Sequence, residues 1–295
     1  MFNIVADTLI YGAWLFIASL GLTLIFGVLR VLNFAHGSFY AVGAYAAAST
    51  TAYLVQHDLP SYWMVAALFV SAVLVSIFLG PLIERLVLKW FYGRSEVTFL
   101  FVTYALFLIM ESVVQAIWGV RPYYATEPYG AFPSVAFAGS QYVGYDFFLV
   151  FVAVMLGVFT HWLMTRTNLG HLTVSVIHNP EISETLGVNV TRVKTTMFSL
   201  GISYAILAGA LTAPTIPVQP GLGINMVIAC FAVVVIGGLG SIPGAAVGAL
   251  VVALARTVAV YSTPGLELFS VYACMTLVLL AKPEGLFPQV ASRRI

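Results

Sequence analysis

Long apolar runs separated by short polar segments make up most of the chain. A helix needs about 20 mostly apolar residues to cross the hydrocarbon core of a membrane. Runs of this kind cover residues 8–29, 34–54, 62–82, 97–119, 145–165 and 195–217. They are apolar on all sides, whereas the strands of a transmembrane barrel alternate between apolar and polar residues. The pattern therefore predicts an all-α integral membrane protein.

The longer apolar stretch 226–258 is interrupted by residues that disfavour a helix interior. These residues are Gly237, Gly238, Gly240, Pro243 and Gly244. We expect two helices or half-helices, 226–239 and 243–258, followed by a last apolar run over 266–281. This gives about eight to nine transmembrane helices in a single domain, 1–295. The pattern leaves open whether 226–258 makes two crossings or a re-entrant break.

The basic residues favour an orientation with the N-terminus outside and the C-terminus in the cytoplasm, because cytoplasmic loops are enriched in Lys and Arg. Ten of the twelve basic residues then lie inside: Arg30, Arg85, Lys89, Arg94, Arg166, Arg192, Lys194, Lys282, Arg293 and Arg294. Only Arg121 and Arg256 fall elsewhere. This orientation requires an odd number of crossings, which favours dividing 226–258 into two.

Composition supports the same class of protein. Hydrophobic residues make up 61% of the 295 residues and charged residues only 8%. Ordinary globular domains are about one quarter charged, so a soluble domain is excluded, and so is a disordered chain. The net charge of +1 gives no sign of nucleic-acid binding. Cys230 and Cys274 lie in apolar runs, where we expect them to pack as small apolar residues.

Two stretches share the same order of marker residues. The first carries Gly27-Val28-Leu29, His36-Gly37 and Val42-Gly43-Ala44, and the second carries Gly237-Gly238-Leu239, Pro243-Gly244 and Val247-Gly248-Ala249. Both interrupt an apolar hairpin near the inner side, with the same predicted direction across the membrane. They favour a parallel internal repeat with broken helices. The alternative is that these small residues only let helices approach closely.

Two polar segments lie on opposite sides of the predicted membrane. The segment 120–144, rich in Tyr and Pro, is expected to form an ordered extracytoplasmic loop, either as an aromatic belt or as a contact surface. The segment 168–192 is the longest cytoplasmic one. It contains Asn179 as a helix N-cap and Pro180 in the first turn, which predicts a short amphipathic helix. This helix either docks on another protein or lies at the lipid interface.

The motifs resemble those of one known family. Gly21-Leu22-Thr23-Leu24-Ile25-Phe26-Gly27 and Val31-Leu32-Asn33-Phe34-Ala35-His36-Gly37 are similar to the opening of branched-chain amino acid ABC transporter permeases of the LivH/LivM type. Further matches follow in order: Ile83-Glu84-Arg85, Asn179-Pro180-Glu181, Leu186-Gly187-Val188-Asn189, Ala205-Ile206-Leu207-Ala208-Gly209, Val235-Ile236-Gly237-Gly238-Leu239-Gly240-Ser241-Ile242-Pro243-Gly244 and Lys282-Pro283-Glu284-Gly285-Leu286-Phe287. The resemblance covers essentially the whole chain and is closer to the LivH branch.

The resemblance implies a multi-pass permease of the bacterial inner membrane that works with other subunits. Members pair with a second permease, two ATP-hydrolysing subunits and an extracytoplasmic substrate-binding protein. Their substrates include branched-chain amino acids, urea, short amides and aromatic acids. The cytoplasmic segment 168–192 would carry the helix that couples to an ATPase subunit. The coupling residues are then expected to be Asn179, Pro180, Glu181, Glu184, Leu186 and Gly187.

Candidate pathway residues lie mainly at the two breaks, where interrupted helices leave free backbone groups for a polar substrate. The set is Asn33, His36, Gly37, Ser38, Glu111, Gly238, Gly240, Ser241, Pro243 and Arg256. His36 either faces the pathway or ties the first break together by hydrogen bonds. Glu111 and Arg256 stand where the family often has Gln and Glu. Glu111 is either a proton relay or a hydrogen-bonded replacement, and Arg256 would suit a carboxylate-bearing substrate.

The chain lacks the motifs of an enzyme. No lysine follows a glycine, so there is no phosphate-binding Gly-Lys pair. We therefore expect no cofactor on this chain and no catalytic residue, with ATP and Mg on partner ATPase subunits. The histidines show no metal-binding cluster. An ABC importer permease is the favoured interpretation, and a stand-alone secondary transporter or channel that uses Glu111 is the alternative. Polar breaks argue against a purely structural membrane subunit.

Overall fold

A computed structural model describes residues 2–137 and 139–287. Its α-helices are α1 Phe2–Leu29, α2 His36–Gln56, α3 Ser61–Leu86, α4 Glu96–Trp118, α5 Glu127–Gly130, α6 Gly144–Arg166, α7 Asn168–His178, α8 Pro180–Thr185, α9 Val190–Thr212, α10 Leu222–Gly237, α11 Ile242–Ser262 and α12 Glu267–Ala281. Two short 3₁₀ helices, η1 Leu88–Phe91 and η2 Pro264–Leu266, extend α3 and precede α12. Strands β1 Ser134–Phe137 and β2 Ser140–Val143 form an antiparallel hairpin.

Seven helical segments of the described chain are long and apolar enough to cross a membrane. They are Phe2–Leu29, Ser61–Phe91, Glu96–Trp118, Gly144–Arg166, Val190–Thr212, Ile242–Ser262 and Pro264–Ala281. The shorter apolar helix α10 has 16 residues. These segments confirm the prediction of a helical integral membrane protein. The small β-hairpin is an addition to the all-α prediction, and it lies within the expected outer loop 120–144.

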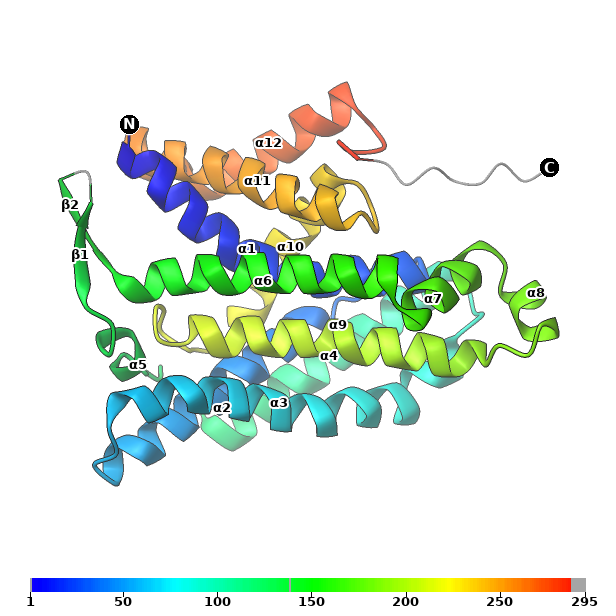
Figure 1. Cartoon of the computed structure of the whole chain (residues 1–295), viewed down its shortest axis with the longest axis horizontal. Helices are drawn as coiled ribbons and strands as arrows, with labels where there is room; N and C mark the ends of the chain where they lie inside the picture. The colour runs from blue at the N-terminus through cyan, green and yellow to red at the C-terminus, as the bar shows by residue number, and fades with distance from the viewer. Residues whose placement is uncertain (1, 138, 288–295) are drawn as a thin grey trace.

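The long helices run roughly along one direction, so the molecule has two distinct ends (Figure 1). The start of α1, the β-hairpin and α5 lie at one end, which we call the hairpin end. Helices α7 and α8 lie at the opposite end, called the α8 end. Helix α3 ends and α4 begins at the α8 end, which places Arg85, Lys89 and Arg94 there. Arg293 and Arg294 lie outside the described residues.

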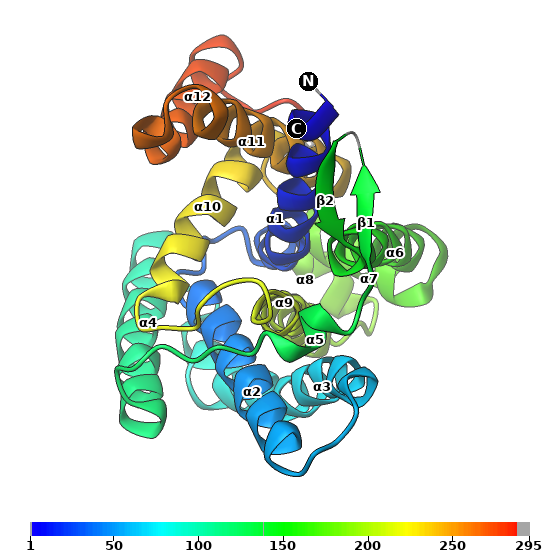
Figure 2. The ribbon, with the colours of Figure 1, turned by 90° about the vertical axis from the view of Figure 1, so that its left-hand side faces the viewer.

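Helices α1 and α9 form the centre of the bundle, with the other long helices around them (Figure 2). Leu20, Ile25, Phe198 and Ile202 on these two helices are almost fully buried. The two backbones come very close where Gly21 meets Gly201, because a Cβ on Gly21 would collide with the Gly201 carbonyl. Small residues permit such close packing of transmembrane helices. The glycines Gly21 and Gly201 therefore set the close approach of α1 and α9.

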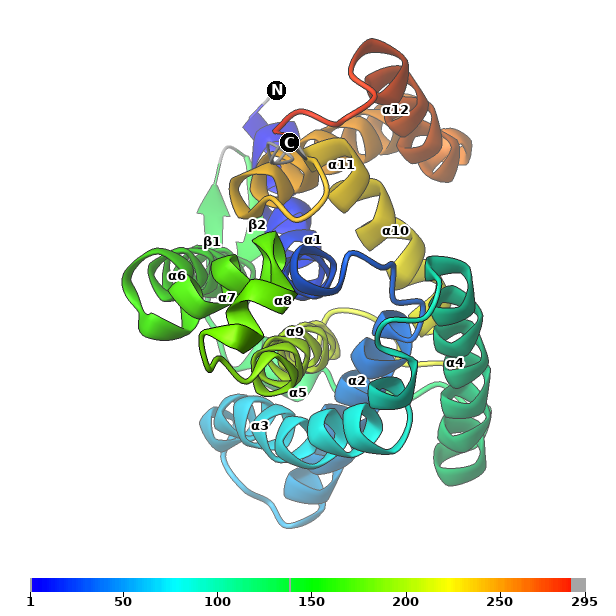
Figure 3. The same ribbon diagram turned by 90° about the vertical axis from the view of Figure 1, so that its right-hand side faces the viewer.

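The peripheral helices expose large apolar side chains to the surroundings. Phe78 on α3, Phe101 on α4 and Leu280 on α12 are all at least 64% exposed. In water such surfaces would be unusual, but in a bilayer they face hydrocarbon. Helix α10 lies between α4 on one side and α11 and α12 on the other (Figure 3). Helix α10 therefore forms the centre of one side face of the molecule, between α4 and the α11–α12 pair.

Several helix boundaries differ from the predicted ones, and those of α9 and α10 bear on the site. The predicted span 195–217 is α9, which begins at Val190 and ends at Thr212. Asn189 caps its start by accepting a hydrogen bond from the Arg192 amide at 2.9 Å, so Thr191 and Lys194 belong to the helix. Helix α10 begins at Leu222, four residues before the predicted 226. The break between α10 and α11 covers residues 238–241, within the glycine-rich sequence that was expected to contain it.

Candidate functional site

The first break, residues 30–35, brings three predicted pathway residues into the protein interior. Asn33, His36 and Ser38 are each at most 1% exposed. The His36 Nε2 atom lies 2.9 Å from the Ala18 carbonyl on α1, and the Ser38 hydroxyl donates to the Phe107 carbonyl on α4 at 3.4 Å. The Asn33 side-chain oxygen accepts from the Ala35 amide at 3.1 Å. These contacts tie the break to both neighbouring helices.

Two polar atoms at the same break have no partner within the described structure. They are Nδ1 of His36 and Nδ2 of Asn33, and both are buried. A buried polar atom without a hydrogen bond is costly. The contacts of His36 support its tying role, while these two atoms are the polar groups that a pathway through the break would use. Their role in transport therefore stays a prediction.

The second break is built from backbone and small residues instead. Gly238 and Gly240 have φ angles of 104° and 81°, which glycine adopts without strain. The Ser241 hydroxyl caps α11 by accepting a hydrogen bond from the Gly244 amide at 3.1 Å, and Pro243 lies in the first turn. The amides of Leu286 and Phe287 donate to the carbonyls of Ile236 and Gly237, both at 2.9 Å. The end of α10 is thus held by a distant part of the chain.

The first break begins close to the second one. A Cβ added to Gly27, near the end of α1, would lie 3.6 Å from the Gly240 Cα. Gly37, in the first turn of α2, is packed against Gly223 at the start of α10, since a Cβ there would collide with the Gly223 carbonyl. The end of α1 therefore lies beside the second break, whereas the start of α2 packs at the opposite end of α10. The internal repeat itself stays a prediction.

Arg256 lies in a cavity of about 200 Å³ near the hairpin end of α11. Its guanidinium forms an ion pair with Glu267, the first residue of α12, and lies 4.0 Å from the centre of the Tyr11 ring. The two charged side chains are about one third exposed, at 30% and 36%. Asn225 of α10 also lines the cavity. Charged groups within membrane helices usually face a cavity or a protein partner.

Sequence reasoning identified Arg256 and missed the residues around it. Glu267, Tyr11, Trp14 and Tyr40 complete the polar lining. Trp14 donates from its indole N–H to the Tyr40 hydroxyl at 3.1 Å, so these rings are fixed in place. The signal in the sequence is Glu267, an acidic residue two positions after the turn Thr263-Pro264-Gly265, where α12 returns beside α11. The cavity combines one positive charge, one negative charge and an apolar wall.

Glu111 is half-buried on α4 and accepts a hydrogen bond from a backbone amide. Its Oε1 atom lies 2.8 Å from the amide nitrogen of Gly221, whose φ angle of 86° forms the turn before α10. An amide oxygen in the same place would accept the same hydrogen bond. This contact is the one expected for a hydrogen-bonded replacement of Gln.

The predicted coupling residues form a compact capped turn at the α8 end. The Asn179 side chain accepts from the Ile182 amide at 3.0 Å, and Pro180 begins α8. Gly187 has a φ angle of 83° and follows the helix. Ile182 and Leu186 are 56% and 76% exposed, so this turn presents apolar side chains outward. Glu181 and Glu184 are exposed beside them. Helix α7, which precedes this turn, was not predicted.

Comparison with known proteins adds an independent observation. The family model described as "Branched-chain amino acid transport system / permease component" matches residues 4–281. The chain belongs to this permease family. It is 28% identical to the high-affinity branched-chain amino acid transport system permease protein LivH of Escherichia coli (strain K12), over 93% of this chain and 91% of that protein.

Two further relatives agree with this assignment. The corresponding permease protein BraD of Pseudomonas aeruginosa is 27% identical over 93% of this permease and 92% of its own length. A probable LivH permease protein of Methanocaldococcus jannaschii is 28% identical over 88% and 81%. The permease is therefore a multi-pass inner-membrane protein of the branched-chain amino acid transport type. The resemblance seen in the sequence motifs is confirmed.

The polar groups in the described part of the permease are dispersed and do not gather around one centre. Among the described residues, no group of three or more His, Cys, Asp or Glu side chains could hold a metal ion. Its polar groups lie instead at helix breaks and in the Arg256 cavity. Such an arrangement can recognise a small polar compound and then change shape around it.

Proposed function

We propose that this permease is the membrane subunit of an ATP-binding-cassette importer. With a second homologous permease it would form the translocation path for a branched-chain amino acid or a related small polar or carboxylate compound. Two partner ATPase subunits would bind ATP and Mg²⁺ and hydrolyse ATP. An extracytoplasmic binding protein would deliver the substrate. This proposal extends the family assignment to the composition of the complex and to the source of energy.

We further propose that the chain crosses the membrane eight to nine times, with the N-terminus outside and the C-terminus in the cytoplasm. Adding α2 and α10 to the seven long apolar segments gives nine crossings. An odd number of crossings puts the two termini on opposite sides. The hairpin end would then be extracytoplasmic, and the basic residues of the α8 end would be cytoplasmic.

The observation that carries the proposal is the exposed apolar turn at the α8 end. Leu186 is 76% exposed in a capped turn that projects beyond the ends of the long helices (Figure 1). A short helix with outward apolar side chains fits a groove on a partner protein. Its two acids, Glu181 and Glu184, disfavour contact with an anionic membrane surface. Docking of an ATPase subunit on this turn explains both features.

The proposed pathway runs along the side face of the molecule that has α10 at its centre. This face contains the Arg256 cavity toward the hairpin end and is flanked by the two breaks toward the α8 end. Asn33, His36, Gly37, Ser38, Gly238, Gly240, Ser241 and Pro243 would change their surroundings when α10 and its neighbours move. A second permease packed on this face would close the path from the lipid.

The test is a double variant of the coupling turn, Glu181→Lys with Leu186→Asp. Both side chains are exposed, so we expect normal folding and a loss of ATP-driven uptake of at least about tenfold, because apolar docking contacts are replaced by charge. Glu96→Lys, an exposed acid at the same end, serves as the matched control and should keep uptake. Measured substrate uptake in cells or proteoliposomes decides. Normal uptake in the double variant would overturn the coupling assignment.

A further inference from the structure

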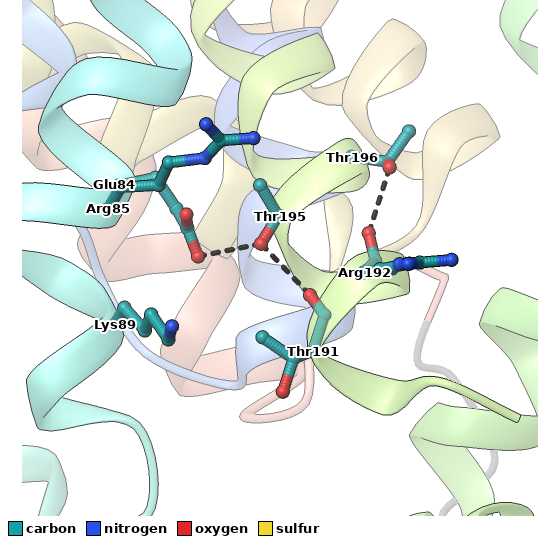
Figure 4. Close-up of a pocket in the computed structure, with 7 residues that line it drawn as sticks. All are labelled: Glu84, Arg85, Lys89, Thr191, Arg192, Thr195 and Thr196. Carbon is teal, nitrogen blue, oxygen red and sulfur yellow. Dashed lines mark hydrogen bonds between the residues drawn. The ribbon is translucent and has the colours of Figure 1, made fainter.

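A second charged pocket lies at the α8 end, far from the Arg256 cavity. It has a volume of about 480 Å³ and lies between the end of α3 and the first turns of α9. Glu84, Arg85, Lys89, Arg192 and three threonines line it (Figure 4). At about 30 Å³ for each water molecule, this is the space of about sixteen waters. The pocket is therefore larger than a single ion needs.

The floor of the pocket carries a buried acid. Glu84 is only 1% exposed, and its Oε1 atom accepts a hydrogen bond from the Thr195 hydroxyl at 2.7 Å. In the part of the chain that the structure describes, no cation forms an ion pair with this carboxylate. The nearby Lys194 ammonium lies over the Tyr92 ring instead, 5.8 Å from its centre. A buried carboxylate without a cationic partner is costly.

The rim of the pocket has the opposite charge. Arg85, Lys89 and Arg192 are all exposed, and in Figure 4 the Arg192 guanidinium points away from Glu84. The threonine hydroxyls carry no charge and leave the rim positive, and that of Thr195 also lies 2.9 Å from the Thr191 carbonyl. Burial and the neighbouring Glu84 raise the pKa of Tyr92, so this phenol stays neutral. The pocket thus offers a negative floor below a positive rim.

An apolar surface leads to the pocket along α3. Phe78, Leu82 and Leu86 follow each other at intervals of four residues, so they share one face of the helix. They are 73%, 50% and 64% exposed. The proposed orientation places this face in the inner half of the membrane and the pocket at the boundary with the cytoplasm. Trp90, 71% exposed beside the pocket, suits the same boundary.

We propose that this pocket binds the headgroup of an ethanolamine phospholipid. The primary ammonium of the headgroup would bind Glu84, and the phosphate would lie against Arg85 and Lys89. The acyl chains would follow Phe78 and Leu82. A headgroup with phosphate but no ammonium leaves Glu84 unpaired, and a trimethylated ammonium has no N–H to donate. Basic pockets at the cytoplasmic side of membrane helices are known to hold lipid headgroups.

The test compares lipids that differ only in the headgroup. The permease, together with the subunits that co-purify, is exchanged into nanodiscs of equal parts phosphatidylethanolamine, phosphatidylglycerol and phosphatidylcholine. Retained lipids are counted by native mass spectrometry after delipidation. We expect phosphatidylethanolamine to be retained at least about threefold over either other lipid. Equal retention of all three, or a preference for phosphatidylglycerol, would overturn the proposal, the latter showing that only the basic rim acts.

Two variants test separately the proposed contacts of the ammonium and of the phosphate. Glu84→Gln should abolish the preference for ethanolamine over glycerol headgroups. Lys89→Gln should weaken the retention of phosphatidylethanolamine and of phosphatidylglycerol alike, because it removes a contact to the phosphate. Arg94→Gln, an exposed basic residue at the same end but outside the pocket, should change neither. Since Lys89 is exposed, its variant keeps the test valid if Glu84→Gln fails to fold. Unchanged lipid ratios in folded Glu84→Gln would overturn the ammonium assignment.

Free phosphoethanolamine and an ATPase contact are the competing occupants. Addition of about 10 mM phosphoethanolamine should not displace the lipid, because the α3 surface contributes to binding. Displacement by the free compound would show a soluble-ligand site and overturn the proposal. If the lipid is retained only after the ATPase subunits are stripped away, the pocket is a subunit contact and the proposal fails.

Discussion

The two charged pockets of this permease hold their acidic residues in opposite ways. At the hairpin end Glu267 is paired with Arg256, and the arginine also lies over the Tyr11 ring. At the α8 end Glu84 is more deeply buried, yet it has a hydroxyl partner and no ion pair among the described residues. The first pocket neutralises itself within the chain. The second holds its acid without an ion pair among the described residues, below an exposed basic rim.

This difference indicates two kinds of ligand. An ion pair within the chain can separate when a substrate offers a carboxylate to the arginine or an ammonium to the glutamate. Such a pair therefore suits transient binding. An acid without an internal ion pair suits an occupant that stays bound, as a structural lipid does. The energetic distinction is testable because breaking a buried ion pair costs more than neutralising an acid that has no ion pair.

The largest effect is expected for Arg256→Glu, which removes the ion pair of the Arg256 cavity. This change puts a second carboxylate beside Glu267 and leaves both without a cation, so we expect the free energy of unfolding to fall by about 2–4 kcal/mol, between the values for exposed and buried pairs. Thermal unfolding in detergent, followed by tryptophan fluorescence, measures it. Adding Glu267→Arg should restore most of the loss. A single variant as stable as the wild type would show that the pair does not matter.

A matched pair of neutral variants sharpens the comparison. Glu267→Gln leaves Arg256 without its partner and should cost about 1–2 kcal/mol. Glu84→Gln keeps an oxygen that can accept from Thr195 and removes a buried acid that has no ion pair, so in lipid-free detergent it should not lower stability. The two unfolding temperatures are compared under identical conditions. Equal losses would mean that Glu84 is already neutralised within the chain.

The smallest effect is expected at a third acid, Glu111. Glu111→Gln keeps an oxygen acceptor for the Gly221 amide, so uptake should stay within about twofold of the wild type and stability within about 0.5 kcal/mol. Glu111→Leu removes that acceptor and should cost about 1–3 kcal/mol. Uptake assays and unfolding temperatures test both. Loss of transport in the Gln variant alone would favour the proton-relay alternative over hydrogen bonding.

The helices were predictable from the sequence because membrane crossing imposes a strong length requirement. The predicted span 97–119 is α4, Glu96–Trp118, and 145–165 is α6, Gly144–Arg166. Errors arose where polar residues lie inside a helix. Thr191 and Lys194 looked like loop residues, but the Asn189 cap starts α9 before them. A side-chain cap can begin a helix in polar sequence, which hydropathy does not detect.

The site was only partly predictable, since the role of each acidic residue depends on partners that are distant in the sequence. Arg256 attracted attention alone, but its partner Glu267 comes from the next helix, and Tyr11 comes from α1. Glu84 was noticed only as part of the motif Ile83-Glu84-Arg85, and its burial against Thr195 follows from the packing of α3 on α9. The contacts of His36 with Ala18, in contrast, agree with the tying role considered for it.

The hydrogen bonds from Leu286 and Phe287 to the end of α10 impose an order on biosynthesis. Phe287 follows its acceptor Gly237 by 50 residues, so α10 is synthesised before these donors exist. Until then, the carbonyls of Ile236 and Gly237 must rely on water or the insertion machinery, because unpaired backbone groups are costly in lipid. A chain that ended just after α12 would therefore contain every membrane helix of the described chain but lack the two amides that bind the end of α10.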